Sequence, residues 1–246
     1  MQTSRPEPGT PMIFQWRKWN GSPHWRHECV YLGSDSWGDW VGQPTGWASA
    51  RPGRAYTVGA PSVTLVPSRG DGSGFALAGI AQPDFSLTVN RGHRKGMRIY
   101  IDLGWDIRWQ GEAGFEPDGD GEGAGGGAGG GAGAGVAGGA AGAPITLAPG
   151  RDDGTALAAG SGEVLATGID MDLDVVRVEG PRGTWVDDRD EWAEHSVRYG
   201  YPRPVMDQLE ALALDLEARV RAQTAPFDDA TADAWLDRLE ALGLER

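Results

Sequence analysis

Three aspartates in an otherwise apolar segment are the first residues whose types and spacing suggest chemistry. Asp170, Asp172 and Asp174 alternate with Met171 and Leu173. Alternate side chains of a strand share a face, so we expect the carboxylates on one face and the apolar residues in the core. Carboxylates spaced about 7 Å apart along a strand repel one another. A cation among them would offset this repulsion.

A second acidic group follows in Asp188 and Glu191, which share one face of a predicted first helical turn. Helix capping is the open alternative, with Asp188 as the N-cap and Glu191 completing a capping box. Asp102, at the end of an apolar run, is a third candidate. An EF-hand is excluded, because its required Gly and Glu positions hold Val175 and Pro181.

Together these segments supply oxygen donors without clustered His or Cys. The candidate metal ligands are Asp102, Asp170, Asp172, Asp174, Asp188 and Glu191. This donor set suits one or two Mg²⁺ or Mn²⁺ ions rather than Zn²⁺. Two such ions would clamp a phosphoryl group and activate a water molecule.

Cationic side chains gather at a predicted hairpin near the start of the chain. An Asn20-Gly21 turn separates Lys18 from His24 and Arg26, and tryptophans lie among them. Cations beside indole rings suit a phosphate and a stacked base. A solvated hairpin without a ligand is the open alternative.

The elements that must position these residues are mainly strands. Short apolar and aromatic segments separated by Gly and Pro predict strands at 12–19, 28–32, 37–41, 62–66, 85–89, 97–102, 172–178 and 184–186. Apolar periodicity predicts helices at 188–198, 205–222 and 229–242. The expected fold is therefore α+β, an antiparallel β-barrel-like domain followed by C-terminal helices.

Composition bounds the organisation of the 246 residues. Gly123–Ala143 is Gly or Ala at every position except Val136, which predicts a disordered, flexible insertion over residues 111–162. We expect residues 12–246 to form a single phosphohydrolase-like domain around it. The net charge of -13 is uneven. The first 110 residues carry 12 Lys and Arg against 8 Asp and Glu, whereas residues 151–246 carry 10 against 22.

Several classes of protein are excluded at this stage. The single cysteine, Cys29, rules out a disulfide framework. No apolar run approaches the length of a membrane span, and the first residues lack an apolar signal core. The acidic balance argues against duplex-DNA binding, which needs a basic face. We therefore expect a cytoplasmic protein.

The order of these motifs resembles the domain-of-unknown-function 402 family. The motifs are Lys18–Trp25, Leu32–Asp35, Ser49–Gly53, Tyr100–Asp102, Asp170–Arg177, Asp188–His195 and Tyr199–Pro202. That family includes bacterial nucleoside di- and triphosphatases and the fosfomycin-pathway cytidylyl-phosphonate hydrolase. The resemblance implies a barrel-like fold and a divalent-metal phosphohydrolase site on the six acids already gathered.

Asp102 is a variant already seen in the family, in which some members have Asn at this position. Two features depart from the family pattern. The phosphatases place a proposed proton-donating Arg directly after the hairpin His, whereas here Trp25 follows and Arg26 comes next. This departure favours a relation to the cytidylyl hydrolase. The second departure is the long insertion, since other members bridge the gap before Asp170 with a short loop.

The sequence therefore predicts a metal-dependent hydrolase of a phosphoanhydride or nucleotidyl ester. Lys18, His24 and Arg26 are the expected catalytic cations, and Trp25 and Arg51 are expected to bind a nucleotide-type substrate. The alternative is an RNA- or nucleotide-binding protein without turnover, in which the basic, Trp-rich N-terminal half stacks bases.

Overall fold

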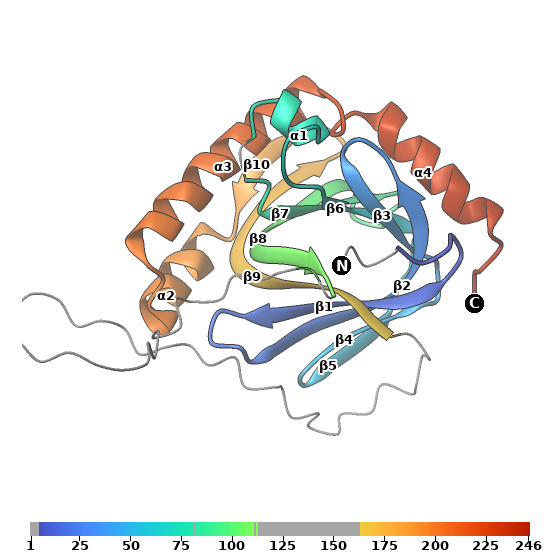
Figure 1. Ribbon diagram of the computed structural model, residues 1–246, viewed down its shortest axis with the longest axis horizontal. Coiled ribbons are helices and arrows are strands. Elements are labelled where there is room, and N and C mark those ends of the chain that lie inside the picture. Colours follow the sequence, from blue (N-terminus) through green and yellow to red (C-terminus); the bar gives the residue numbers. More distant parts are fainter. Residues whose placement is uncertain (1–4, 81, 111, 113–162) are drawn as a thin grey trace, which may run out of the picture.

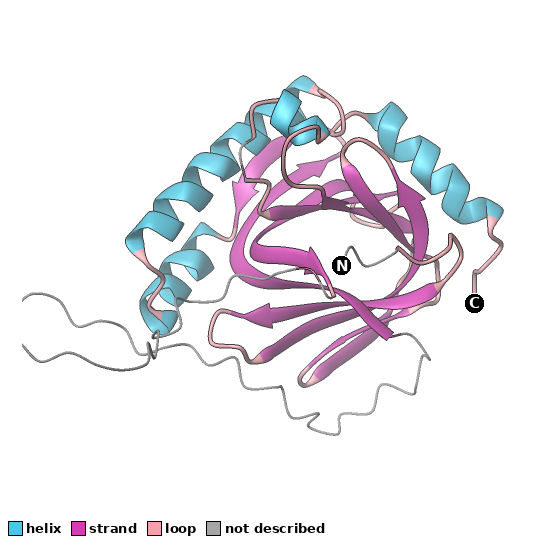
Figure 2. Cartoon of the chain, viewed as in Figure 1, coloured by secondary structure: helices cyan, strands magenta, loops and turns pink. Residues whose placement is uncertain are grey.

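The computed structural model describes residues 5–80, 82–110, 112 and 163–246, and its strands form one continuous sheet (Figures 1 and 2). The strands are β1 (Pro11–Lys18), β2 (Pro23–Ser34), β3 (Gly38–Gln43), β4 (Ala48–Arg51), β5 (Arg54–Thr57), β6 (Ser62–Pro67), β7 (Phe85–Asn90), β8 (Met97–Trp109), β9 (Glu163–Val178) and β10 (Thr184–Asp187). The predicted insertion at 111–162 lies outside the described residues except for Glu112.

The sheet closes into a barrel in the order β1-β9-β8-β7-β6-β3-β2, because β1 also pairs with β2. The β4–β5 hairpin continues from β2, and β10 pairs with β9. The expected barrel is thus confirmed. One pairing differs from an all-antiparallel arrangement, since β1 and β9 run parallel with Lys18 beside Asp170. This pair joins the first strand to the strand that carries the aspartates.

Helices cover one side of the barrel (Figure 1). They are α1 (Gly74–Leu77), α2 (Arg189–Tyr199), α3 (Arg203–Ala222) and α4 (Asp229–Ala241). Gly200 ends α2 in the left-handed conformation at φ 66°, and Pro204 stands in the first turn of α3. The chain therefore turns sharply between α2 and α3. After this turn, α3 contacts β9 and β10.

Two hydrophobic cores lie on opposite faces of the sheet. The outer core joins strand residues such as Leu65 and Ile101 to helix residues such as Leu209 and Leu216. The inner core contains no helix residue among those described. Its members are Met12, Phe14, Trp16, Cys29, Tyr31, Val41, Val66, Ile107, Trp109 and Ala166. This second cluster therefore forms the apolar part of the barrel interior.

All eight predicted strands and all three predicted helices are present. The strands around 28–32, 97–102 and 172–178 are longer than expected. The sequence pattern did not predict the β4–β5 hairpin or α1. Every residue of β5 is exposed and α1 has a single turn, so neither leaves a hydrophobic periodicity.

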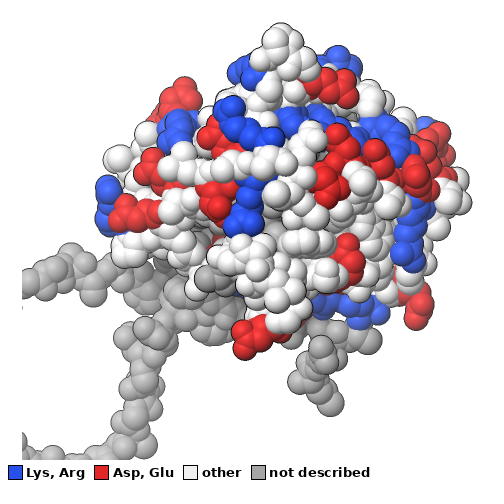
Figure 3. All heavy atoms as spheres, turned by 90° about the horizontal axis from the view of Figure 1, so that it is seen from above, with Lys and Arg blue, Asp and Glu red and all other residues white. Residues whose placement is uncertain are grey.

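Acidic and basic side chains are intermixed on the helix-covered side of the molecule (Figure 3). Arg98 contacts Asp229 and Asp233, and Arg91 contacts Asp237 and Glu240. Four acids of α4 are thus paired with arginines from β8 and the turn after β7. Among the described residues, no helix combines the length and hydrophobicity needed to cross a membrane.

We expect His27 to contribute a loss of barrel stability in mild acid. Its Nδ1 lies 2.9 Å from Ser49 Oγ, and burial, reinforced by nearby His24, lowers its pKa to about 4. Above pH 6.5 the imidazole is neutral in both states. Between pH 6.5 and 4, His27 is protonated in the unfolded chain but neutral in the folded protein. Its contribution to stability therefore falls as the pH is lowered. Urea unfolding at pH 7.5 and pH 5 measures this loss.

The matched variant is His27→Gln, which removes the titrating group. Wild type should lose more unfolding free energy than the variant over this pH interval, by an amount on the order of 1 kcal/mol. An equal loss in both proteins would contradict the assignment of this acid sensitivity to His27.

Candidate metal centre

Two predicted ligands lie directly opposite each other on neighbouring strands. Asp102 of β8 is in register with Asp174 of β9 on one side and with Ser86 of β7 on the other. The Ser86 hydroxyl donates to Asp102 Oδ2 at 3.2 Å, and the Tyr100 hydroxyl donates to Asp174 Oδ2. The three strands therefore hold two carboxylates side by side.

The electrostatics of this pair are unfavourable. Burial raises the pKa of Asp102 to about 7, and the charge of Asp170 adds to the effect. Burial and the neighbouring charge of Asp102 raise the pKa of Asp174 well above its ordinary value. Like charges opposite one another destabilise a sheet. The pair is thus an anionic site that favours a proton or a cation.

Asp188 joins this pair from the start of α2. It stands at the N-cap in a left-handed conformation, φ 56°, and its side chain makes no capping hydrogen bond. The capping interpretation is therefore wrong. The side chain is in hydrogen-bond contact with Asp174 instead, and burial, with the charge of Asp187, raises its pKa. Left-handed backbone costs a non-glycine residue about 1–3 kcal/mol and is concentrated at functional sites.

Lys18 neutralises a second group of acids. Its Nζ lies 2.9 Å from Asp170 Oδ2 and also hydrogen-bonds Asp172, while His24 Nε2 lies 2.8 Å from Asp170 Oδ2. Burial opposes ionisation of Asp170, but His24 and Lys18 outweigh it and lower the pKa to about 2. Burial likewise opposes the charge on Lys18, and the two aspartates raise its pKa. Asp170 is consequently a stable anion.

The register places Lys18 and Asp170 on the inward face of the barrel. Along β1 and β9, Phe14 pairs with Ala166 and Trp16 pairs with Gly168, two steps before Lys18 pairs with Asp170. Phe14, Trp16 and Ala166 belong to the inner core. Because side chains alternate along strands, the ion pair continues the same face. The charged site thus caps the apolar interior.

Asp172 links the barrel to α2. It lies where the β8–β9 register shifts, and its φ of 65° departs from strand geometry. The Tyr201 hydroxyl donates to Asp172 Oδ2 at 2.8 Å, and His195 Nδ1 lies 2.9 Å from the same oxygen. Met171 and Leu173 remain fully buried in the outer core. The predicted alternation therefore holds for the apolar residues, with Asp172 in a local irregularity.

Glu191 is the most exposed of the six acids, and it lies on the solvent side of the group. Its side chain is 55% exposed, and its Oε1 lies 3.9 Å from His195 Nδ1. Ligand atoms of Asp172, Glu191 and His195 all lie within 4.8 Å of one another. The six predicted acids are thus brought to one region by β8, β9 and α2.

The other predicted site residues lie on the neighbouring strands. Arg51 stacks over Trp25 at 4.8 Å, and Tyr56 meets the same indole edge-on. Trp25 also adjoins the ring of His24. Arg26 belongs to β2, where its backbone pairs with Gln15 and Ala50, and its Nε is buried without a hydrogen-bond partner among the described residues.

Pattern reasoning missed four polar residues as members of the site. They are Ser86, Tyr100, His195 and Tyr201. Tyr100 is two residues before Asp102 and His195 is four residues after Glu191, so each shares a face with a predicted ligand. Tyr201 lies in the connection between α2 and α3, within the Tyr199–Pro202 motif, whereas Ser86 of β7 leaves no comparable signal.

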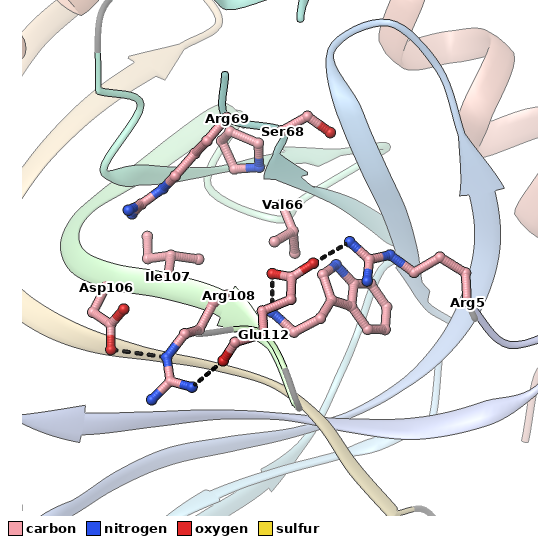
Figure 4. Close-up of a pocket in the computed structure, with 10 residues that line it drawn as sticks. Arg5, Val66, Ser68, Arg69, Asp106, Ile107, Arg108 and Glu112 are labelled. Carbon is pink, nitrogen blue, oxygen red and sulfur yellow. Dashed lines mark hydrogen bonds and ion pairs between the residues drawn. The ribbon is translucent and has the colours of Figure 1, made fainter. Parts of the chain in front are cut away.

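A cavity of about 350 Å³ lies elsewhere in the barrel, lined in part by inner-core residues Val66, Ile107 and Trp109 (Figure 4). None of the six predicted ligands lines it. Arg5 at its wall pairs with Asp39 and Glu112. The guanidinium is therefore occupied by protein acids, and this cavity is separate from the candidate metal centre.

The closed barrel, its covering helices and the inward-facing acids define an α+β barrel protein with an oxygen-rich candidate cation site. No family model and no curated protein matches this chain. Two solved structures share its fold. One is the complex of FomD with CDP, with a TM-score of 0.54, 11% identity, and coverage of 93% of each chain.

The second structure is the phosphatase SC4828 with the non-hydrolysable nucleotide GPCP. Its TM-score is 0.54 and its identity 15%, covering 95% of this chain and 90% of the other. At these identities the likeness establishes the fold.

We expect Asp102→Asn to stabilise the metal-free protein. Folding raises the pKa of Asp102 to about 7. Its carboxyl group therefore contributes fully to stability only below its pKa in the unfolded chain, and this contribution is lost as the pH rises through about 7. A neutral amide avoids that loss. With chelator at pH 8, the variant should gain stability on the order of 1 kcal/mol or more, and less at pH 5.

Asp170→Asn is the matched control, for which we expect the opposite change in stability. Its carboxylate has a lowered pKa and faces Lys18 and His24, so removing the charge should destabilise the protein at pH 8. Thermal unfolding of both variants checks the pair. Destabilisation by Asp102→Asn at pH 8 would show that repulsion does not dominate there.

Proposed function

We propose that this protein is a divalent-metal-dependent hydrolase of a phosphoanhydride or phosphate ester in a nucleotide-type substrate. The observation that supports this proposal most is the partly buried Asp102–Asp174–Asp188 group, which lies beside the Lys18–Asp170–His24 cluster. The two fold neighbours were solved with CDP and with a nucleotide analogue, and one is named a phosphatase. Nucleoside di- or triphosphates and cytidylyl esters are the proposed substrates.

The donor set fits Mg²⁺ or Mn²⁺. Asp102, Asp174 and Asp188 would supply hard carboxylate oxygens, and their raised pKa values reflect burial with too little compensating positive charge. Asp170, Asp172 and Glu191 are the further proposed ligands. A bound divalent ion would polarise the phosphoryl oxygen and lower the pKa of a water molecule.

The cationic residues of the chain would stabilise the reacting phosphate and protonate the leaving group. Lys18 carries a fixed positive charge at the inward face and would offset charge on phosphate oxygens. His24 and Arg26 are the proposed proton donors to the leaving group. His24 is the stronger candidate, because a guanidinium retains its proton in proteins. Asp170 would orient the His24 ring through Nε2.

Trp25 and Arg51 would bind the nucleotide beside this machinery. Their cation–π contact holds a planar, positively charged surface next to His24. Arg51 would pair with a phosphate oxygen, and the Trp25 and Tyr56 rings would contact the base. In this proposal the phosphate chemistry would take place at the barrel interior, and Trp25 of β2 and Tyr56 of β5 would contact the base.

We expect turnover in a panel of nucleoside di- and triphosphates and cytidylyl esters with Mn²⁺, and none in chelator. Asp188→Ala should lower kcat/KM by at least about 100-fold, because it removes a proposed ligand. Asp190→Ala is the matched control, an exposed acid in the same helical turn, and should retain activity. Product analysis identifies the bond that is cleaved.

Equal activity of the Asp188→Ala and Asp190→Ala proteins would contradict the role of Asp188. Turnover that persists in the Asp172→Ala, Asp188→Ala double variant would overturn the site as a whole. Thermal unfolding and circular dichroism of each variant separate loss of function from loss of fold.

The alternative of binding without turnover is distinguishable in solution. Trp16, Trp19, Trp40, Trp47 and Trp109 are buried, so they provide no stacking surface for RNA. If the protein only binds RNA, affinity measured by fluorescence anisotropy should fall steeply with salt and persist in chelator. Under the proposed function, nucleotide turnover should instead require the divalent ion.

A further inference from the structure

One face of α2 presents two potential metal ligands to β9. Glu191 and His195 are four residues apart, so they lie on adjacent turns of the same helix face. Asp172 approaches from β9, with Oδ2 at 2.9 Å from His195 Nδ1. Glu191 Oε1 lies 3.9 Å from that nitrogen. Three donors from two elements thus converge on one point.

The separations match a coordination sphere. Metal–ligand bonds of about 2.1 Å place adjacent octahedral donors about 3 Å apart and opposite donors about 4.2 Å apart. The 2.9 and 3.9 Å separations fall in this range, and the donors of all three residues lie within 4.8 Å. Small side-chain adjustments would therefore suffice to bind an ion.

The His195 ring nitrogen is poorly satisfied by the protein alone. Nδ1 is shut off from solvent, and among the described residues it has no well-aligned hydrogen bond. Its approach to Asp172 is close enough for an ion pair but lacks hydrogen-bond geometry. Asp172 Oδ2 accepts from the Tyr201 hydroxyl and retains a second lone pair. A metal ion would satisfy both atoms.

We propose that His195 is a metal ligand and that, with Asp172 and Glu191, it forms a second cation site of mixed nitrogen and oxygen donors. The first site is the oxygen-only group of Asp102 and Asp174 with Asp188. Lys18, bound to Asp170 and Asp172, lies beside the second group. The inference deepens the proposed function, since it rests on that function and divides its ligands between two ions.

The two sites should differ in the metal ion that they prefer. Imidazole nitrogen favours a first-row transition-metal ion over Mg²⁺, whereas carboxylates alone accept either. The half-exposed Glu191 leaves the second site open to solvent, which gives the ion a path of entry. The His195 site should therefore prefer Mn²⁺ or Co²⁺ to Mg²⁺.

The test is Mn²⁺ binding to the 246-residue protein, measured by titration calorimetry and by pulsed electron paramagnetic resonance. Wild type should show ¹⁴N coupling from a directly bound imidazole. His195→Ala should lose that coupling and weaken Mn²⁺ binding at one site by at least about 10-fold, the lower end of losses from outer-shell changes. His93→Ala, a histidine in the β7–β8 turn, is the matched control and should retain both signals.

His195→Gln provides a second variant of similar volume, so that loss of coupling is not confused with loss of fold. Mn²⁺ binding with ¹⁴N coupling unchanged in both His195 variants would overturn the inference while leaving the proposed function intact. Coupling that survives in His195→Ala but disappears in His24→Ala would also overturn it. Absence of Mn²⁺ binding in wild type would overturn the inference together with the metal dependence of the proposed function.

Discussion

Repulsion among buried carboxylates is the constraint around which this site is organised. Asp102 and Asp174 are held opposite one another by strand register, so neither can move away without breaking the sheet. Asp170 is relieved by Lys18 and His24, and its pKa is lowered. Burial and the charge of Asp170 outweigh the relief that Ser86 and Lys18 give Asp102, and its pKa is raised. The same face of one barrel thus contains a stable anion and a carboxyl pair that favours a proton or a cation.

The barrel creates this contrast through its closure. The parallel pairing of β1 with β9 places Lys18 next to Asp170, although 152 residues separate them along the chain. The antiparallel pairing of β8 with β9 places Asp102 next to Asp174. Charge compensation on one side of β9 and charge repulsion on the other follow from which strand lies beside it.

Packing on the outer face fixes the helix that completes the site. Trp192 and Tyr201 pack into the outer core, and Tyr201 meets Trp19 edge-on at 5.7 Å. The Tyr201 hydroxyl then reaches Asp172. The hydrophobic contacts that attach α2 to the barrel therefore also set the positions of Asp188 and His195. Loss of packing there would disturb the site without changing any charged residue.

Local sequence patterns determined most of the elements and the six acids. Alternation and helical periodicity depend on neighbours a few residues apart, so the strands, the helices and the grouping of the acids could be predicted from the sequence. The tertiary structure alone decided the partners of those acids. Strand register, the irregularity at Asp172 and the seating of α2 are set by long-range pairing and packing. These contacts explain why Asp188 faces Asp174 rather than capping its helix, and why His195 reaches Asp172.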